Sequence, residues 1–335
     1  MERFAYHSLP MKNSIFVLIL LLMSGHFAAA GTNPSAEQAL TTAEKQANLF
    51  SADAGPFRLE IDFVAQNVVP MKGHLTLKWA AENRWWRSVT LGDFHEIDVR
   101  NGEYLYISRN LGYTPIRIKE LESLMQLFKD GQQAQITKVK QRTEHGASLM
   151  CLQLQRKGWK EKNEFCIDPN SHDLFSDLNE SSEDTIKKEY ADYHEFRGHR
   201  YPATLTFLNN GSKAVNATVT DLETSAFNEA LLMAPAGSIK RRRCRDMQNA
   251  IAISTPEPLL PPSIHGYDLN GEAKVALTVL TDGSVDNIQL IESGGGQIDE
   301  TTLNSLKRWK FKPAMCGMEP VVSDIEVGMN FQTVH

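Results

Sequence analysis

The stretch GEAKVALTVLTDGSVDNIQL, residues 271–290, decides the fold of the last part of this chain. Alternation of apolar and polar residues over its first half is typical of a strand with one buried face. Asp282-Gly283 follows, and Asp-Gly between two apolar runs is a strong signal for a tight hairpin turn. The sequence therefore predicts a β-hairpin. Its inward positions are Ala273, Val275, Leu277 and Val279, and Val285, Ile288 and Leu290 on the return strand.

A helix and a final strand are predicted after this hairpin. Ser293 and Gly294 open a glycine loop, and Asp299 stands where it would cap a following helix. Apolar residues recur at every third position of that helix, and Pro313 stops it. The last strand alternates apolar with polar residues, so the whole unit is a β-hairpin–α–β module. The helix positions are Leu303, Leu306 and Trp309, and the strand positions are Ile325, Val327, Met329 and Phe331.

The order of these residues resembles that of the TonB C-terminal domain family, over roughly the last quarter of the chain. In that family the domain lies between the two membranes of a bacterial envelope and adds a strand to a short peptide of an outer-membrane transporter. The resemblance implies a partner strand at the edge formed by Val321, Ile325, Val327, Met329 and Phe331. The residues that carry it include Gly271, Asp282, Gly283, Ser293, Gly294, Asp299, Trp309, Phe311 and Pro313.

Length and composition are those of a two-domain globular protein. The chain has 335 residues, of which 41% are hydrophobic and 23% are charged. A net charge of −6 gives no reason to expect a nucleic-acid partner. An even number of cysteines, four, fits an oxidising compartment.

The N-terminus, residues 1–30, has the features of a secretory signal peptide. A positive start at Met11-Lys12, which is a possible initiation site, precedes an apolar run, and small residues follow at 28–30. The run is shorter than the about 20 apolar residues that span a membrane. We therefore expect export to the periplasm, with an inner-membrane anchor over 14–23 as the alternative.

Residues 57–225 are expected to form a long antiparallel meander of about ten strands, interrupted by one helix that begins at Thr114-Pro115. A sheet of that length must curl, close or split. The expected fold is therefore mainly β: a curved, half-open barrel with one or two helices on its concave face. The inward series is expected to continue through Ile97 and Val99, and the helix stripe consists of Leu121, Leu124, Met125 and Phe128.

This arrangement resembles the periplasmic lipoprotein carriers of the LolA and LolB type over residues 31–238. The pattern Gly73-x-Leu-x-Leu-x-Trp79, followed by Arg84-Trp-Trp-Arg87, carries the comparison. In that family such a sheet forms an apolar cavity for acyl chains. The aromatic and aliphatic residues expected in the wall belong either to the core or to a lipid cavity: Phe57, Leu59, Ile61, Phe63, Leu75, Leu77, Trp79 and Trp85.

A basic, proline-containing linker is predicted over 239–263, and the TonB-like domain over 264–335. The basic run at 240–245 is expected to be solvated or to lie near anionic head groups. The proline spacer at 256–262 reaches only about 20 Å in an extended form. A spacer of that length favours binding or scaffolding over the transmission of force across a periplasm.

The four cysteines are predicted to form two disulfides. Cys151 and Cys166 stand opposite each other across a turn centred near Gly158, and the remaining pair is Cys244 with Cys316. Metal ligation is the alternative, but the sequence has no Cys-x-x-Cys or His-x-x-x-His spacing. No nucleophile motif or phosphate-binding loop is present either, so neither cofactor nor metal is expected.

These features lead to two hypotheses. The first is a non-enzymatic envelope protein whose C-terminal module binds an outer-membrane or periplasmic protein, as energy transducers do. The second is a soluble carrier of a lipid or a lipoprotein acyl chain, with that module as a docking handle. An exposed edge strand also allows a strand-swapped homodimer.

Overall fold

The computed structural model describes residues 34–66, 69–129, 134–155, 162–181, 185–244, 247–259 and 270–332. The predicted signal peptide, the alternative anchor and the end of the proline spacer lie outside these residues. Within the described ranges, no helix is both long enough and apolar enough to span a membrane.

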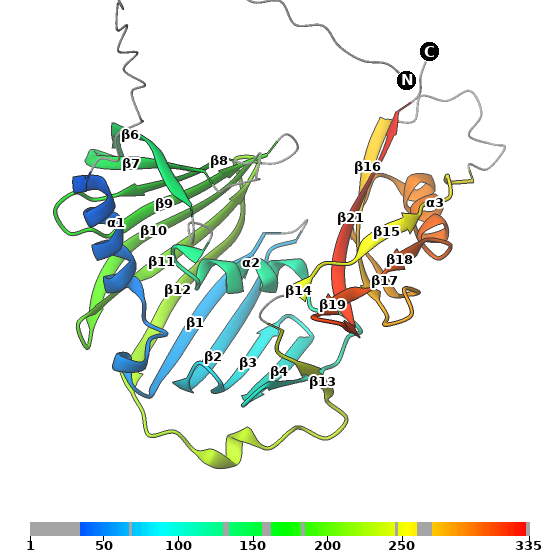
Figure 1. Ribbon diagram of the computed structural model, residues 1–335, viewed down its shortest axis with the longest axis horizontal. Helices are drawn as coiled ribbons and strands as arrows, with labels where there is room; N and C mark the ends of the chain where they lie inside the picture. Colours follow the sequence, from blue (N-terminus) through cyan, green and yellow to red (C-terminus); the bar gives the residue numbers. More distant parts are fainter. Residues whose placement is uncertain are drawn as a thin grey trace, which may run out of the picture. The chain divides into compact units, whose positions relative to one another are not determined.

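In the described residues, thirteen antiparallel strands form one large sheet (Figure 1). Their order is β13-β5-β4-β3-β2-β1-β12-β11-β10-β9-β8-β7-β6. The strands are β1 (Phe57–Ala65), β2 (Met71–Ala81), β3 (Arg84–Leu91), β4 (Phe94–Asn101), β5 (Tyr104–Arg109), β6 (Gln135–Glu144), β7 (Ala147–Gln155), β8 (Lys162–Ile167), β9 (Leu174–Glu180), β10 (Thr185–Phe196), β11 (His199–Asn209), β12 (Ser212–Thr224) and β13 (Ile239–Arg242).

The prediction of a mainly β protein built on a curved antiparallel sheet is confirmed, but its topology differs from a single meander. Strands β1–β5 form one meander and β6–β12 a second, and the two are joined where β1 pairs with β12. The helix α2 (Ile116–Leu124) connects β5 to β6, which lie near opposite ends of the sheet. Nine residue pairs join β1 to β12, so the first strand of one meander and the last strand of the other meet in the middle of the sheet.

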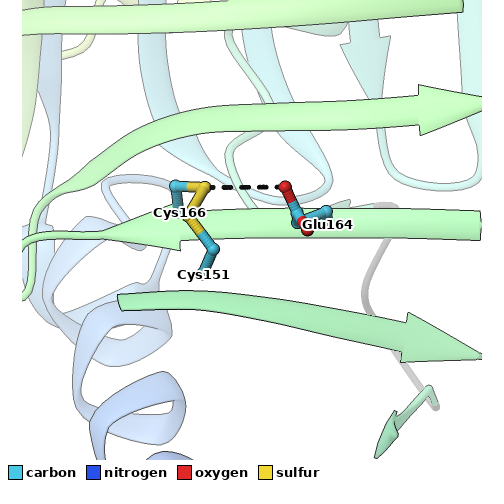
Figure 2. Close-up of side chains that lie close together, drawn as sticks. All are labelled: Cys151, Glu164 and Cys166. Carbon is cyan, nitrogen blue, oxygen red and sulfur yellow. Dashed lines mark hydrogen bonds between the residues drawn. A yellow bond between two sulfur atoms is a disulfide. The ribbon is translucent and has the colours of Figure 1, made fainter. Parts of the chain in front are cut away.

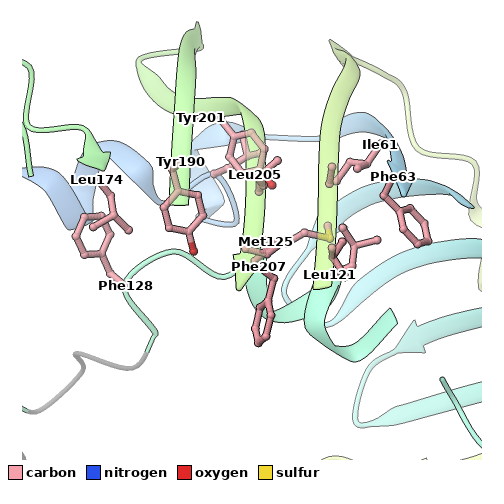
Figure 3. Packing of buried hydrophobic residues seen from close by; sticks show 14 of the residues in the cluster. Ile61, Phe63, Leu121, Met125, Phe128, Leu174, Tyr190, Tyr201, Leu205 and Phe207 are labelled. Carbon is pink, nitrogen blue, oxygen red and sulfur yellow. The ribbon is translucent and has the colours of Figure 1, made fainter. Parts of the chain in front are cut away.

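Two helices cover the concave face of this sheet, α1 (Pro34–Ala47) and α2 (Figure 1). The predicted stripe of Leu121, Leu124, Met125 and Phe128 is buried, and Figure 3 shows Leu121 and Met125 within the cluster formed with strand residues such as Phe207. The described residues of the domain also include the short 3-10 turns Ala52–Ala54 and Glu229–Leu232.

The inward face of β4 was predicted incorrectly. Directly opposite residues of antiparallel neighbours share a face, and Glu96 lies opposite the buried Val89, so Glu96 points inward. Ile97 and Val99 therefore face outward, and the inward residues are Phe94, Glu96, Asp98 and Arg100. The inward positions of β4 are therefore one residue away from the positions expected from its apolar residues. Pairing with β3 across the tight β3–β4 turn sets these positions, and the apolar pattern of β4 alone does not predict them.

The segment predicted as a solvated linker contains three strands. β13 adds an edge strand to the large sheet by pairing with β5, from Ile239 opposite Ile107 to Arg242 opposite Tyr104. β14 (Met247–Gln248) and β15 (Ile251–Ser254) pair with strands of the C-terminal module. The sheet thus extends beyond residue 238. Backbone pairing orders this basic stretch even though its side chains are largely exposed.

The C-terminal module is a three-stranded sheet, β17-β16-β21, packed against helix α3. Its core joins Val275, Leu277 and Val279 of the hairpin to Leu306 and Phe311. Two smaller sheets flank it, β14-β19-β20 and β15-β18. The elements are β16 (Asn270–Val279), β17 (Val285–Glu292), α3 (Gly296–Leu306), β18 (Lys310–Lys312), β19 (Ala314–Cys316), β20 (Glu319–Val321) and β21 (Ser323–Gln332).

Three details of this module differ from the prediction. Gly295 is the residue that precedes α3, and the Asp299 carboxylate accepts instead from the Gly294 backbone N–H at 2.8 Å. Trp309 follows the helix rather than belonging to it, because the chain turns towards β18 after Leu306. Val321 lies in β20, opposite Ala314, and is therefore not part of the edge strand.

Candidate functional site

A cavity of about 580 Å³ opens on the concave face of the β domain, which comprises α1 to β13. The register of the sheet brings its lining together. Trp79 lies opposite Trp85, and Trp85 lies opposite Arg100 on its other side, so the three form a row across β2, β3 and β4. The lining residues are Phe50, Leu77, Trp79, Glu82, Trp85, Arg87, Asp98, Arg100, Leu105, Glu122, Met125, Gln126, Lys129 and Arg243.

One side of this cavity is aromatic. The Phe50 ring meets the Trp79 ring edge-on, with centroids 5.1 Å apart, and Trp79 in turn stacks on Phe57 at 6.2 Å. Edge-on and offset contacts of this kind favour a fixed ring orientation. The aromatic side of the cavity is thus held by rings that belong partly to the core.

Another part of the lining belongs to a network of charged side chains around Arg87. The Arg87 guanidinium contacts Asp98, Glu96 and, at 2.7 Å, Glu122 of α2. Thr114 donates a hydrogen bond to Glu96 at 2.5 Å. Burial, followed by the neighbouring Asp98 carboxylate, raises the pKa of Glu96 to about 7. The network ties α2 to β3 and β4 and so fixes one wall of the cavity.

A second cavity of about 370 Å³ lies along the same helix. The second cavity shares Glu122, Gln126 and Lys129 with the larger cavity. Its far wall holds the buried pair Lys188 and Asp177, whose side-chain atoms approach to 3.3 Å. Buried opposite charges need each other, because a buried charge without its partner is strongly unfavourable.

The structure separates the eight predicted wall residues into two groups. Leu77, Trp79 and Trp85 line the larger cavity. The other five are almost fully buried in the core beneath α1 and α2, so they support the sheet without facing the cavity: Phe57, Leu59, Ile61, Phe63 and Leu75. Sequence reasoning missed Arg87, Asp98, Arg100 and Glu122; charged residues at alternate positions of one strand were the available signal.

The glycines of the TonB-like pattern permit close backbone contacts. Gly283 has φ of 78°, accepts a hydrogen bond from the Phe311 backbone N–H at 2.9 Å, and a Cβ there would lie 1.9 Å from the Phe311 carbonyl oxygen. Gly271 and Gly294 approach each other in the same way, since a Cβ on Gly271 would lie 2.9 Å from the Gly294 oxygen. These contacts explain why the hairpin turn and the Trp-x-Phe-x-Pro segment occur together.

The edge strand of the module is β21. It pairs with β16 over ten residues without a register shift, and within the described residues its other edge pairs with no strand. Ile325, Val327 and Met329 are half-buried against the core, and Glu326 and Asn330 on the opposite face are exposed. Four of the five predicted edge residues therefore lie on this strand, on its core-facing side.

Both predicted disulfides are present, Cys151–Cys166 and Cys244–Cys316. Cys151 and Cys166 are directly opposite on β7 and β8, and Figure 2 shows Glu164 beside them. The three side chains are close enough to hold a metal ion. Both sulfurs are used in the disulfide, however, and Glu164 pairs with Arg142 at 2.8 Å. The arrangement therefore stabilises the outer face of the sheet and offers no thiolate ligand.

Comparison with known proteins identifies a family match for the C-terminal part of the chain. Residues 256–333 match the sequence model of the family described as Gram-negative bacterial TonB protein C-terminal. The chain is 30% identical over 73 residues to Protein TonB of Escherichia coli (strain K12). The match covers 22% of this chain and 30% of that protein, so the chain spans under a third of this curated relative.

Two solved structures are similar in fold. The match with a LolA superfamily protein of Nitrosomonas europaea covers 59% of this chain and 97% of that protein's chain, with a TM-score of 0.41 and 9% identity. The match with the TonB C-terminal domain of Pseudomonas aeruginosa covers 27% of this chain and 93% of that domain's chain, with a TM-score of 0.23 and 22% identity. On the family match, residues 256–333 of this chain are a TonB C-terminal domain.

Proposed function

We propose that this protein is a non-enzymatic adaptor of the cell envelope, exported to the periplasm, whose C-terminal module binds a protein partner by strand addition at β21. The observation that carries the proposal is the regular edge of β21, which no other strand of the described residues occupies. Its unpaired N–H and C=O groups can hydrogen-bond to an extended peptide, and the exposed alternate side chains can add specificity.

The other edge of the same sheet is less suited to a partner strand. β17 shifts register twice against β16, between Lys274 and Val275 and again between Ala276 and Thr278. Asn287 within it has φ of 48°. Bulges and left-handed residues twist an edge and interrupt its hydrogen-bonding groups. The binding strand is therefore β21, and a partner is an outer-membrane transporter or a lipoprotein with an extended segment.

The connection to the β domain favours binding or scaffolding over force transmission. β13 ends at Arg242, and Cys244, two residues later, is disulfide-bonded to Cys316 of the module. A short covalent link of this kind gives the module little reach away from the large sheet. A transducer that spans a periplasm needs a long spacer instead.

Proline substitutions in β21 test this proposal. Successive backbone N–H groups of a strand point to opposite edges of that strand. Of the substitutions Glu326→Pro and Val327→Pro, one therefore removes an N–H that points inward, towards β16, and the other removes an N–H that points outward, towards the unoccupied edge. The outward substitution is expected to leave the module folded and to abolish co-purification of the partner. Glu326→Ala, which keeps the N–H, is the matched control. Retained partner binding by both folded proline variants would contradict strand addition at this edge.

The cavity supports a second candidate function, a carrier of a lipid or of a lipoprotein acyl chain. At about 580 Å³ it falls within the range of small-molecule sites, about 300 to 1,000 Å³, and six of its fourteen lining residues are apolar or aromatic. Native mass spectrometry of the full chain purified without detergent tests this function. Co-purified lipid supports transport, and an empty β domain that also takes up no added lipid contradicts it.

A further inference from the structure

We propose that the larger cavity of the β domain binds an anionic amphiphile, with its acyl chain against Trp79 and Trp85 and its head group on the Arg100 guanidinium. This inference rests on the carrier function proposed above and names the class of ligand. It is carried by one feature of the cavity, the partly buried Arg100 guanidinium, to which no residue that the structure describes supplies an ion pair.

Arg100 projects from the inward face of β4 into the cavity lining. Its Nη1 atom is buried and has no hydrogen-bond partner in the described part of the chain. Nor does its guanidinium form an ion pair with any described carboxylate within 4.0 Å. The guanidinium lies over the Trp85 ring, with 5.8 Å between the guanidinium carbon and the ring centroid.

The acidic residues around the cavity are already paired with other cations. Asp98 and Glu122 contact Arg87, and Glu82 contacts Arg243. The lining has four basic side chains, from Arg87, Arg100, Lys129 and Arg243, against three acidic ones, from Glu82, Asp98 and Glu122. The cavity lining therefore has an excess of positive charge, and the partly buried Arg100 contributes to that excess.

A buried, unpaired guanidinium is unfavourable, and arginine cannot relieve the cost by losing its proton. Burial, together with the nearby Arg243 cation, lowers the pKa of Arg100, and the more distant Asp98 and Glu82 carboxylates offset only part of this effect. A carboxylate or phosphate oxygen at Nη1 would supply the missing acceptor. Charge-assisted hydrogen bonds of this type are among the strongest in proteins.

The rest of the cavity fits the apolar part of the same ligand. Trp85 contacts Arg100 with one face and lies opposite Trp79 on β2, so the aromatic part of the cavity lies directly beside the Arg100 guanidinium. Leu77, Phe50 and Met125 continue that wall towards α1 and α2. A neutral lipid would fill the apolar part and leave Nη1 without an acceptor, so the arrangement favours an anionic head group.

Calorimetric titration with matched single-chain probes tests the inference on the full-length protein. Laurate, dodecyl phosphate and dodecyl maltoside share a twelve-carbon chain and differ in head group, and each is used below its micellar concentration. The wild type is expected to bind at least one anionic probe about tenfold or more tighter than the maltoside. A preference for laurate identifies a fatty acid as the ligand, and a preference for dodecyl phosphate identifies a phospholipid head group.

Substitution of Arg100 assigns the preference to this residue. Arg100→Gln is expected to bring the anionic probes to the affinity of the maltoside without weakening the maltoside, and Arg100→Lys is expected to restore part of the preference. Arg58→Gln is the matched control, because Arg58 lies on the outer face of β1, where it pairs with Asp221. Thermal unfolding of each variant verifies that the β domain is folded.

The possible failures are distinguishable. If no probe binds the wild type, the carrier function itself is wrong. If all three bind equally, or if Arg100→Gln keeps the preference for an anion, the cavity is a lipid site but the assignment of an anionic ligand to Arg100 is wrong.

Discussion

Removing each disulfide is expected to destabilise a different part of the protein. A crosslink stabilises a fold mainly by restricting the unfolded chain, and in the chain-entropy model this effect grows with the logarithm of the loop length. Cys151–Cys166 closes 15 residues and Cys244–Cys316 closes 72. The model gives about 3 kcal/mol for the first disulfide and about 4.4 kcal/mol for the second at 25 °C.

The two loops enclose different elements. The short loop joins neighbouring strands of the large sheet, and the long loop encloses the module from β14 to β19. Cys244→Ala with Cys316→Ala should therefore lower the unfolding free energy of the C-terminal module by about 4 kcal/mol and leave the β domain unchanged. Cys151→Ala with Cys166→Ala should affect the β domain alone, by about 3 kcal/mol plus the packing lost where two buried sulfurs are removed.

Hydrogen exchange as a function of urea measures the two parts separately in each variant. Reduced wild-type protein serves as the reference for loss of both crosslinks. If the variant that lacks Cys244 and Cys316 kept wild-type protection in β16 and β21, the long loop would not restrain the module. Equal loss of protection in both parts would show that the two parts unfold as one unit, and the reasoning by loops would be wrong.

Two further predictions concern single residues. Gly283→Ala should destabilise the module by about 1–2 kcal/mol more than Gly317→Ala in thermal unfolding: both residues have positive φ, but a Cβ at Gly317 meets nothing within 4 Å. Equal effects would show that the contact with Phe311 carries no weight. The pKa of Glu96 is raised in the folded state, so the folded protein binds a proton at Glu96 more tightly than the unfolded chain does. Proton binding at Glu96 therefore stabilises the fold below pH 4.5, and this contribution is lost as the pH rises from about 4.5 to about 7. In urea unfolding, the stability of Glu96→Gln relative to wild type should therefore be higher at pH 8 than at pH 5. A stability difference that does not change with pH would contradict the raised pKa.

The hairpin and its turn could be predicted because they depend on local sequence. Alternating apolar residues around Asp282-Gly283 determine both strands, and the same turn chemistry applies in any context. The disulfide between Cys151 and Cys166 followed from the register about a turn, which is also local. The partner of β1 could not be predicted, because its pairing with β12 joins residues 150 or more positions apart.

The cavity was predicted only in part, for a related reason. Apolar alternation identified Trp79 and Trp85, but it also selected Phe57 and Leu59, since a core residue and a cavity residue on the same face give the same pattern. Whether α2 covers a residue depends on tertiary packing. The inward charges of β4 were missed because the prediction followed apolar residues alone.

The most direct test of the central claim, strand addition at β21, is site-specific photo-crosslinking in the cells that produce the protein. A photoreactive amino acid is placed at Glu326 or Asn330 on β21, and at Asp286 on β17 as the control. We predict that both β21 positions crosslink to one extended segment of a single envelope protein, at sites about four residues apart, and that Asp286 does not. Crosslinking to that protein from Asp286 alone, or crosslinks from β21 only to a second copy of this chain, would contradict the account.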